Sequence, residues 1–141
     1  MITEHFETLS RDTAGARILL VEDDVMLREA LVDTLQHFGY LVYDAGSGAE
    51  ALAAARRIST ANIDLVISDL VMPGMNALEL YEALQVAAYR GKMLVITGYP
   101  MPYAGESLVE RPDVQWVSKP IGGDELAQLI RRMLRGTLHA G

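Results

Sequence analysis

The chain has no cysteine among its 141 residues, so it can form neither a disulfide framework nor a thiolate metal site. Histidine is also scarce, because only His5, His37 and His139 are present and two of these lie near the ends of the chain. We expect His37, which precedes Phe38, to be a helix-end residue. A zinc site therefore has poor support, and any metal site has to rest mainly on oxygen ligands.

Long apolar runs are missing as well. No uninterrupted apolar stretch approaches the roughly 20 residues that a membrane-spanning helix needs. The N-terminus, MITEHFETLS, carries acids where a signal peptide would be basic and then apolar. We therefore expect a cytoplasmic protein whose domain makes no contact with a membrane.

Basic residues are the minority charge, with 12 Lys and Arg against 19 Asp and Glu and a formal net charge of −7. Non-specific binding to nucleic acid needs clustered Lys and Arg, so we expect no direct nucleic-acid contact. An acidic balance suits a basic partner surface or a bound cation, although most acidic proteins are acidic only for solubility.

Short apolar runs alternate with segments of helical spacing along most of the chain, whose length suggests one domain. Near-continuous apolar strands in this order predict an α/β fold, with a parallel, doubly wound, five-stranded sheet and about five helices, similar to flavodoxin. The expected strands are 18–21, 40–45, 64–69, 92–97 and 114–118, and the expected helices are 26–38, 49–58, 76–88, 103–110 and 124–134.

The ends of the chain lack this pattern. Residues 1–16 are expected to form a flexible arm or linker, residues 17–135 the domain, and residues 136–141 a C-terminal tail. We expect neither end to hold a DNA-binding or effector domain. Output is therefore expected through contact with a partner, or through other domains of a longer chain.

The stretch VISDLVMPGM places a single carboxylate, Asp69, at the end of an apolar strand. A buried carboxylate is costly unless it is paired or binds a metal. Asp69 is therefore either a turn residue at a solvent-facing strand end or the partner of a cation.

Other polar groups also follow predicted strands, and ligands bind outside the carboxyl ends of the strands in sheets of this kind. Taken singly, each group has an ordinary explanation; for Asp24 we favour the N-cap of the next helix. Crowded carboxylates repel one another and need a cation, and Mg²⁺ suits carboxylate oxygens best. The groups at the strand ends are Glu22-Asp23-Asp24, Asp69, Thr97-Gly98 and Ser118-Lys119-Pro120.

These groups have the parts needed for phosphoryl transfer onto a carboxylate. Asp69 would be the nucleophile, while Lys119 and the Thr97 hydroxyl would donate to the oxygens of the transferring group. The position of Asp69 at the end of a buried strand would then present it to the incoming phosphoryl group.

Four segments carry a resemblance to a known family: RILLVEDD at 17–24, IDLVISDLVMPGMNALEL at 63–80, LVITGYP at 94–100 and WVSKPI at 116–121. In sequence and spacing the chain resembles the response-regulator receiver domains of two-component signalling, over roughly residues 16–134. The segment ITGYP, with a Trp before the SKP motif, is more specifically similar to receivers of hybrid histidine kinases.

The resemblance implies a metal-dependent phosphoacceptor site. Asp69 would be the phosphoacceptor and a Mg²⁺ ligand. Asp23 would bind the metal directly, Glu22 would act through water, and the backbone carbonyl of Val71 would complete the protein ligands.

The resemblance also implies a conformational switch. Thr97 would move to bind a phosphoryl oxygen and Lys119 would pair with it, ahead of a Lys119–Pro120 bond that is often cis in this family. Trp116 stands where the family usually has the rotamer-switching Tyr or Phe; its larger ring is expected to hinder an inward flip.

Two further departures concern the backbone. Asn76-Ala77 stands where Asp-Gly is common; Asn can cap a helix, but Ala accepts a positive φ less readily than Gly. The prolines between Gly98 and Pro112 predict a short or irregular helix in that segment.

The expected function is therefore a phospho-switch. A histidine kinase or histidine phosphotransfer protein would donate a phosphoryl group to Asp69, and the domain would catalyse only its own phosphorylation and dephosphorylation. One alternative is a small hydrolase with an Asp nucleophile, which would need a second acid that Leu70-Val71 does not supply. Another is a docking module of the same fold that does not depend on phosphorylation.

Overall fold

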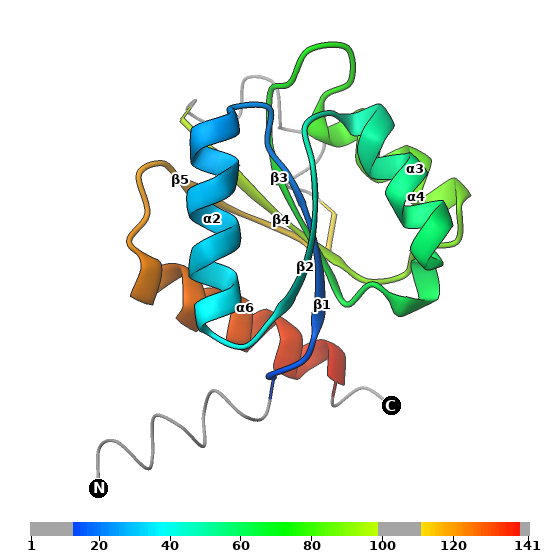
Figure 1. The fold of residues 1–141 in the computed structure, drawn as a ribbon. Helices are drawn as coiled ribbons and strands as arrows, with labels where there is room; N and C mark the ends of the chain where they lie inside the picture. Colours follow the sequence, from blue (N-terminus) through cyan, green and yellow to red (C-terminus); the bar gives the residue numbers. More distant parts are fainter. Residues whose placement is uncertain (1–12, 99–110, 139–141) are drawn as a thin grey trace, which may run out of the picture.

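The structure, a computed structural model, describes residues 13–98 and 111–138. A five-stranded sheet runs through its middle and helices cover both faces, which confirms the predicted doubly wound fold (Figure 1). All strand pairs are parallel, in the spatial order β2-β1-β3-β4-β5. The strands are β1 (Arg17–Val21), β2 (Leu41–Ala45), β3 (Leu65–Asp69), β4 (Lys92–Thr97) and β5 (Val114–Ser118). The helices are α2 (Val25–His37), α3 (Gly48–Ile58), α4 (Ala77–Val86) and α6 (Gly123–Leu138), with a 3-10 turn, η1 (Thr60–Asn62).

The described ranges therefore hold four of the five expected helices. The fifth, expected at residues 103–110, lies outside the described residues. Both β4 and β5 have the predicted bounds, whereas α6 runs four residues beyond its predicted end at Leu134.

The three inner strands are buried on both faces, as a parallel sheet between two helix layers requires. Alternate side chains, such as those of Leu19 and Val66, pack in one core cluster with α3 and α4. The side chains between them, such as those of Leu20 and Ile67, pack in a second cluster with α2 and α6. The apolar runs of the sequence are thus explained by burial on both sides.

Side-chain caps start the helices that follow the strands. The Asp24 carboxylate accepts a hydrogen bond from Leu27 N–H at 3.1 Å, and the Ser47 hydroxyl accepts one from Glu50 N–H. The Asp24 N-cap agrees with the sequence prediction. These caps fix where each helix begins, and so fix the length of the loops that carry the polar groups at the strand ends.

The loop after β3 does not place a positive φ at Ala77, the position where Ala was expected to accept one less readily than Gly. The positive φ in this loop falls at Gly74 (φ 84), where glycine adopts it without strain. Ala77 is the first residue of α4 and is fully buried, while Asn76 and Glu79 form a capping box. Ala77 therefore needs no left-handed backbone, and the expected penalty does not arise.

The end of the stretch expected to be an arm lies against the domain. Thr13 is buried, and its hydroxyl forms a 2.9 Å hydrogen bond with the Tyr40 hydroxyl. Gly15 N–H donates to the Gly39 carbonyl at 2.8 Å. These contacts hold residues 13–16 beside the turn between α2 and β2.

Two valines give a matched test of this core. Val66, on β3, is fully buried (0% exposed), whereas Val86, at the end of α4, is 90% exposed. Val66→Ala is expected to lower the free energy of unfolding by about 2 kcal/mol, because it removes buried methyl groups and leaves a cavity. Val86→Ala should change it by less than about 0.5 kcal/mol. Urea unfolding of both variants checks this, and equal losses would contradict the packing described here.

Candidate functional site

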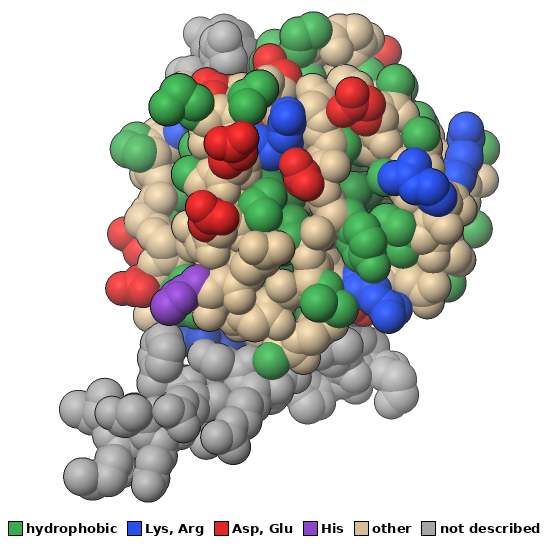
Figure 2. All heavy atoms as spheres, viewed as in Figure 1, with side chains coloured by type: hydrophobic (Ala, Val, Ile, Leu, Met, Phe, Trp, Pro, Cys, Tyr) green, Lys and Arg blue, Asp and Glu red, His purple; other side chains and the backbone are tan. Residues whose placement is uncertain are grey.

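Acidic side chains collect where the strands end. In the view of Figure 2 they gather over the upper part of the molecule, above the carboxyl ends of the strands seen in Figure 1. Glu22 and Asp23 directly follow β1, and Asp69 is the last residue of the neighbouring strand β3. Each of the three offers a carboxylate oxygen, and these oxygens lie within 4.8 Å of one another. The structure thus brings together the three predicted carboxylates.

The three carboxylates differ in their access to solvent. Glu22 is only 3% exposed, the Asp69 side chain is 12% exposed, and Asp23 is exposed. Buried carboxylates of this kind need compensation by a cation or by hydrogen bonds. Asp24 N–H supplies one hydrogen bond, to Glu22 Oε2 at 3.1 Å.

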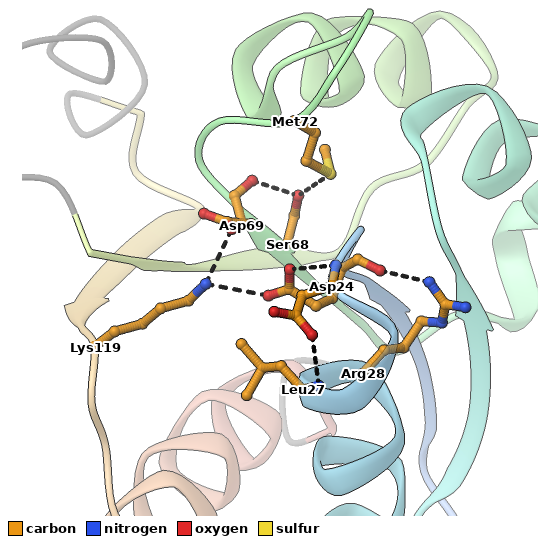
Figure 3. A network of polar contacts seen from close by, with 8 residues as sticks. Asp24, Leu27, Arg28, Ser68, Asp69, Met72 and Lys119 are labelled. Carbon is orange, nitrogen blue, oxygen red and sulfur yellow. Dashed lines mark hydrogen bonds and ion pairs between the residues drawn. The ribbon is translucent and has the colours of Figure 1, made fainter.

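Lys119 supplies the cation. Its Nζ lies 3.0 Å from Asp69 Oδ2 and 3.2 Å from Glu22 Oε1, so one ammonium group bridges the carboxylates that follow β1 and end β3 (Figure 3). This contact answers the question posed by a carboxylate at the end of a buried strand. Asp69 is paired, and the partner is a predicted site residue.

The protonation equilibria reflect this pairing. Burial raises the pKa of the Glu22 carboxyl, and the hydrogen bonds from Asp24 and Lys119 offset this only in part. Burial lowers the pKa of Lys119, but its hydrogen bonds to Asp69 and Glu22 outweigh that effect and leave the pKa raised. Lys119 therefore stays charged at neutral pH and faces both carboxylates.

The backbone holds Lys119 in place. Its N–H donates to the Thr97 carbonyl at 2.8 Å, and Thr97 pairs with Ser118 at the ends of β4 and β5. Thr97 is fully buried, and the Lys119–Pro120 peptide bond is cis. Thr97 and Lys119 are thus joined through the main chain at the edge of the sheet where Asp69 lies.

Two further predicted residues, Val71 and Trp116, are exposed. Val71 is exposed in the loop after β3, two residues beyond Asp69. Trp116 is on β5, paired with Val95, and is 42% exposed. Its side chain is therefore partly in solvent, three residues before Lys119.

Two residues that contact the site were not predicted. The buried Ser68 hydroxyl donates to the Asp69 carbonyl at 2.8 Å (Figure 3). Arg28 Nη1 donates to the Glu22 carbonyl at 2.8 Å, and Arg28 Nε lies 3.2 Å from Asp44 Oδ2. No feature of the sequence pattern pointed to Ser68. An arginine one turn into the helix after the acidic run was a weak signal for Arg28.

The donor set fits a hard divalent cation. Three carboxylates with oxygens close together offer the oxygen ligands that Mg²⁺ prefers. Asp69 has an ammonium group beside its carboxylate, a chemical group that is able to act as a nucleophile. The arrangement can therefore bind a cation and present a nucleophilic oxygen at one place.

Known proteins share this sequence pattern. The family model described as "Response regulator receiver domain" matches residues 18–131. Sensor kinase CckA of Brucella abortus is 32% identical over 122 residues, which are 86% of this chain and 13% of that protein. DNA-binding response regulator MtrA of Mycolicibacterium smegmatis is 34% identical over 125 residues, which are 88% of this chain and 53% of that protein.

Solved structures of receiver domains are also similar to this chain. The crystal structure of the receiver domain from the hybrid histidine kinase CckA matches with a TM-score of 0.72 and 30% identity, covering 84% of this chain and 99% of that one. A receiver domain from Clostridium thermocellum matches with a TM-score of 0.80 at 20% identity, which supports the fold alone.

The chain spans only part of these curated relatives, between 13% and 53% of the length of the two proteins above. Within the described ranges, no helix combines the length and the apolar character needed to cross a bilayer.

Proposed function

The chain belongs to the response-regulator receiver domain family of two-component signalling, and on that premise we propose that it takes a phosphoryl group from a phosphohistidine onto Asp69. The observation that carries the proposal is the Lys119 ammonium group, which bridges Asp69 and the buried Glu22 within a group of three carboxylates. If Asp69 were only a turn residue, it would need neither a second buried acid beside it nor an ammonium group shared with that acid.

In the proposed step, a carboxylate oxygen of Asp69 attacks the phosphorus atom. The P–N bond of the phosphohistidine breaks, and the imidazole leaves with the bonding electron pair and takes up a proton. Lys119 holds Asp69 Oδ2 at 3.0 Å, which orients the other carboxylate oxygen. Because Asp69 ends a strand fixed between β1 and β4, the nucleophile is held in position before the donor arrives.

The residues proposed to hold Mg²⁺ are Asp23, Asp69, the Val71 carbonyl and, through water, Glu22. When bound, Mg²⁺ neutralises charge on the transferring phosphoryl group. The residues of the chain carry the rest of the proposed step. Exposed Asp23 faces solvent from which a cation can enter, and buried Glu22 is paired with Lys119.

The proposed switch begins at Thr97 and Lys119. A phosphoryl group on Asp69 adds negative charge and acceptor oxygens that attract the Thr97 hydroxyl and the Lys119 ammonium group. Lys119 N–H is bonded to the Thr97 carbonyl, so movement of one residue is transmitted to the other. Trp116, on β5, would then change its exposure and present a different surface to a partner.

A surface beside the site suits the phosphodonor. Val25 and Met26 are exposed apolar residues at the start of α2. Next to them lies a hollow of about 270 Å³, with a lining that is largely apolar and includes Leu27, Pro120 and Ile121. We infer that a histidine kinase or a histidine phosphotransfer protein docks here, where its phosphohistidine would reach Asp69.

Intact mass spectrometry tests the proposed function. Wild-type protein incubated with Mg²⁺ and acetyl phosphate is expected to gain one phosphate, and chelation of the metal by EDTA should prevent the gain. Beryllofluoride, which mimics the phosphoryl group, should bind under the same conditions. Failure of both would leave a docking module that does not depend on phosphorylation, whereas continuous release of phosphate from a phosphate ester would indicate a hydrolase.

A further inference from the structure

Arg28 joins three parts of the molecule near the carboxylates without belonging to the predicted site. It lies in the first turn of α2, and its Nη1 donates to the Glu22 carbonyl at 2.8 Å (Figure 3). Its Nε pairs with Asp44 of β2 at 3.2 Å. We propose that Arg28 is a positioning residue that holds Glu22 and Asp23 in the geometry required for binding Mg²⁺. The inference rests on the proposed function and extends it to a residue outside the ligand set.

The backbone of Glu22 is fixed on both sides. Its N–H donates to the Ala45 carbonyl at 3.0 Å, which continues the pairing of β1 with β2. Its carbonyl accepts the hydrogen bond from Arg28. The peptide unit that follows is the one that leads to Asp23, so the Arg28 contact sets the direction in which the chain presents this exposed ligand.

Arg28 is itself held by its surroundings. The pair with Asp44 keeps the guanidinium group against the end of β2, and the Arg28 side chain is largely buried. Gly46 lies close to it, because a Cβ atom built at Gly46 would come within 2.8 Å of Arg28 Nη1 and within 3.2 Å of Glu50 Oε2. Gly46 N–H also donates to Glu50 Oε2 at 2.7 Å. The absence of a side chain at position 46 is therefore what leaves room for the guanidinium group.

The planar guanidinium fork is suited to this task. It donates in two directions at once, to the carbonyl between two metal ligands and to a carboxylate on the neighbouring strand. A lysine at this position would keep the charge but present a single point donor. Partners that orient metal ligands typically contribute 10-fold to 100-fold to metal affinity.

A purely structural role for Arg28 makes a different prediction. If the contact only pinned α2 to β2, its loss would lower the thermal midpoint but leave the Mg²⁺ affinity of the folded protein unchanged. A positioning role predicts a loss of affinity at temperatures where the variant is fully folded.

The experiment measures the Mg²⁺ dissociation constant by isothermal titration calorimetry, together with the thermal midpoint in EDTA. Arg28→Ala is expected to weaken Mg²⁺ binding by about 10-fold. Arg28→Lys should give a smaller loss. Gly46→Ala leaves Arg28 in the sequence but crowds its guanidinium group, and should weaken binding in the same direction. Arg57→Ala, which removes an exposed arginine at the far end of α3, is the matched control and should bind as wild type.

Unchanged affinity in the Arg28 and Gly46 variants, with wild-type protein binding Mg²⁺ and accepting phosphate, would overturn the positioning role and leave the proposed function intact. A lower thermal midpoint without a change in affinity would do the same. Failure of wild-type protein to bind Mg²⁺ would overturn both. If Arg28→Ala does not fold, the comparison of Arg28→Lys and Gly46→Ala with wild type decides the question.

Discussion

Asp69→Asn is expected to abolish the phosphate that wild-type protein gains from acetyl phosphate, with a rate of modification lowered by at least about 1,000-fold. The amide has nearly the shape of the carboxylate but is not a nucleophile for phosphorus. Its loss of charge also removes one of the two carboxylate partners of Lys119. Intact mass and the rate of phosphate uptake, both measured with Mg²⁺ present, check this expectation.

A matched substitution separates the nucleophile from general effects of charge. Asp33→Asn removes an exposed carboxylate from α2 and should take up phosphate at the wild-type rate. Peptide mapping of phosphorylated wild-type protein should place the group on the peptide that contains Asp69. A phosphate that persists in Asp69→Asn would show that another side chain is the acceptor.

The fold could be predicted from the sequence because its strands are bounded by sharp changes in polarity. The run Lys92–Thr97 ends at Gly98, and Val114–Ser118 ends just before Lys119-Pro120, so both strands have the predicted bounds. The end of α6 was less predictable. The helix was predicted to end at Leu134, but Gly136 costs a helix only about 1 kcal/mol, and α6 continues to Leu138.

The carboxylates of the site could be predicted because parallel strands bring their ends to one edge. Which of these acids is buried could not be predicted, because Glu22 and Asp23 are adjacent and chemically alike. In the structure, Glu22 is the acid that contacts Lys119, which lies 97 positions further along the chain. Contacts of this kind depend on tertiary packing, as does the contact of Arg28 with Asp44, and they leave no periodic pattern in the sequence.

Lys119→Met is expected to lower the free energy of unfolding by about 3 kcal/mol at neutral pH in EDTA, because removing one member of a buried ion pair leaves the other charge uncompensated. Methionine keeps much of the aliphatic length, so the loss reports on the ammonium group. Glu22, which is 3% exposed, would keep its burial and its hydrogen bond from Asp24 but lose its cation. Chemical unfolding at several pH values measures the effect.

The pH dependence identifies Glu22 as the source of the loss. Burial already raises the pKa of Glu22 in the folded protein, so the folded state holds the proton more tightly than the unfolded chain does. Stability therefore falls as the pH rises from the unfolded pKa, near 4.3, through the folded pKa, and stays low above it. Without Lys119 the folded pKa rises further, so the fall extends to higher pH. The variant should differ most from wild type near neutral pH and much less in acid.

Lys92→Met provides the control for this profile. Lys92 Nζ donates to the Met133 carbonyl at 3.3 Å, so its loss removes a hydrogen bond to a neutral acceptor, worth about 1 kcal/mol, and should not depend on pH in this range. Added Mg²⁺ should narrow the gap between Lys119→Met and wild type, since a bound cation would compensate the carboxylates that the ammonium group no longer neutralises. A loss of stability in Lys119→Met that is equal at acid and neutral pH would mean that Glu22 does not depend on Lys119 for its charge. The central contact of the proposed site would then have no electrostatic role.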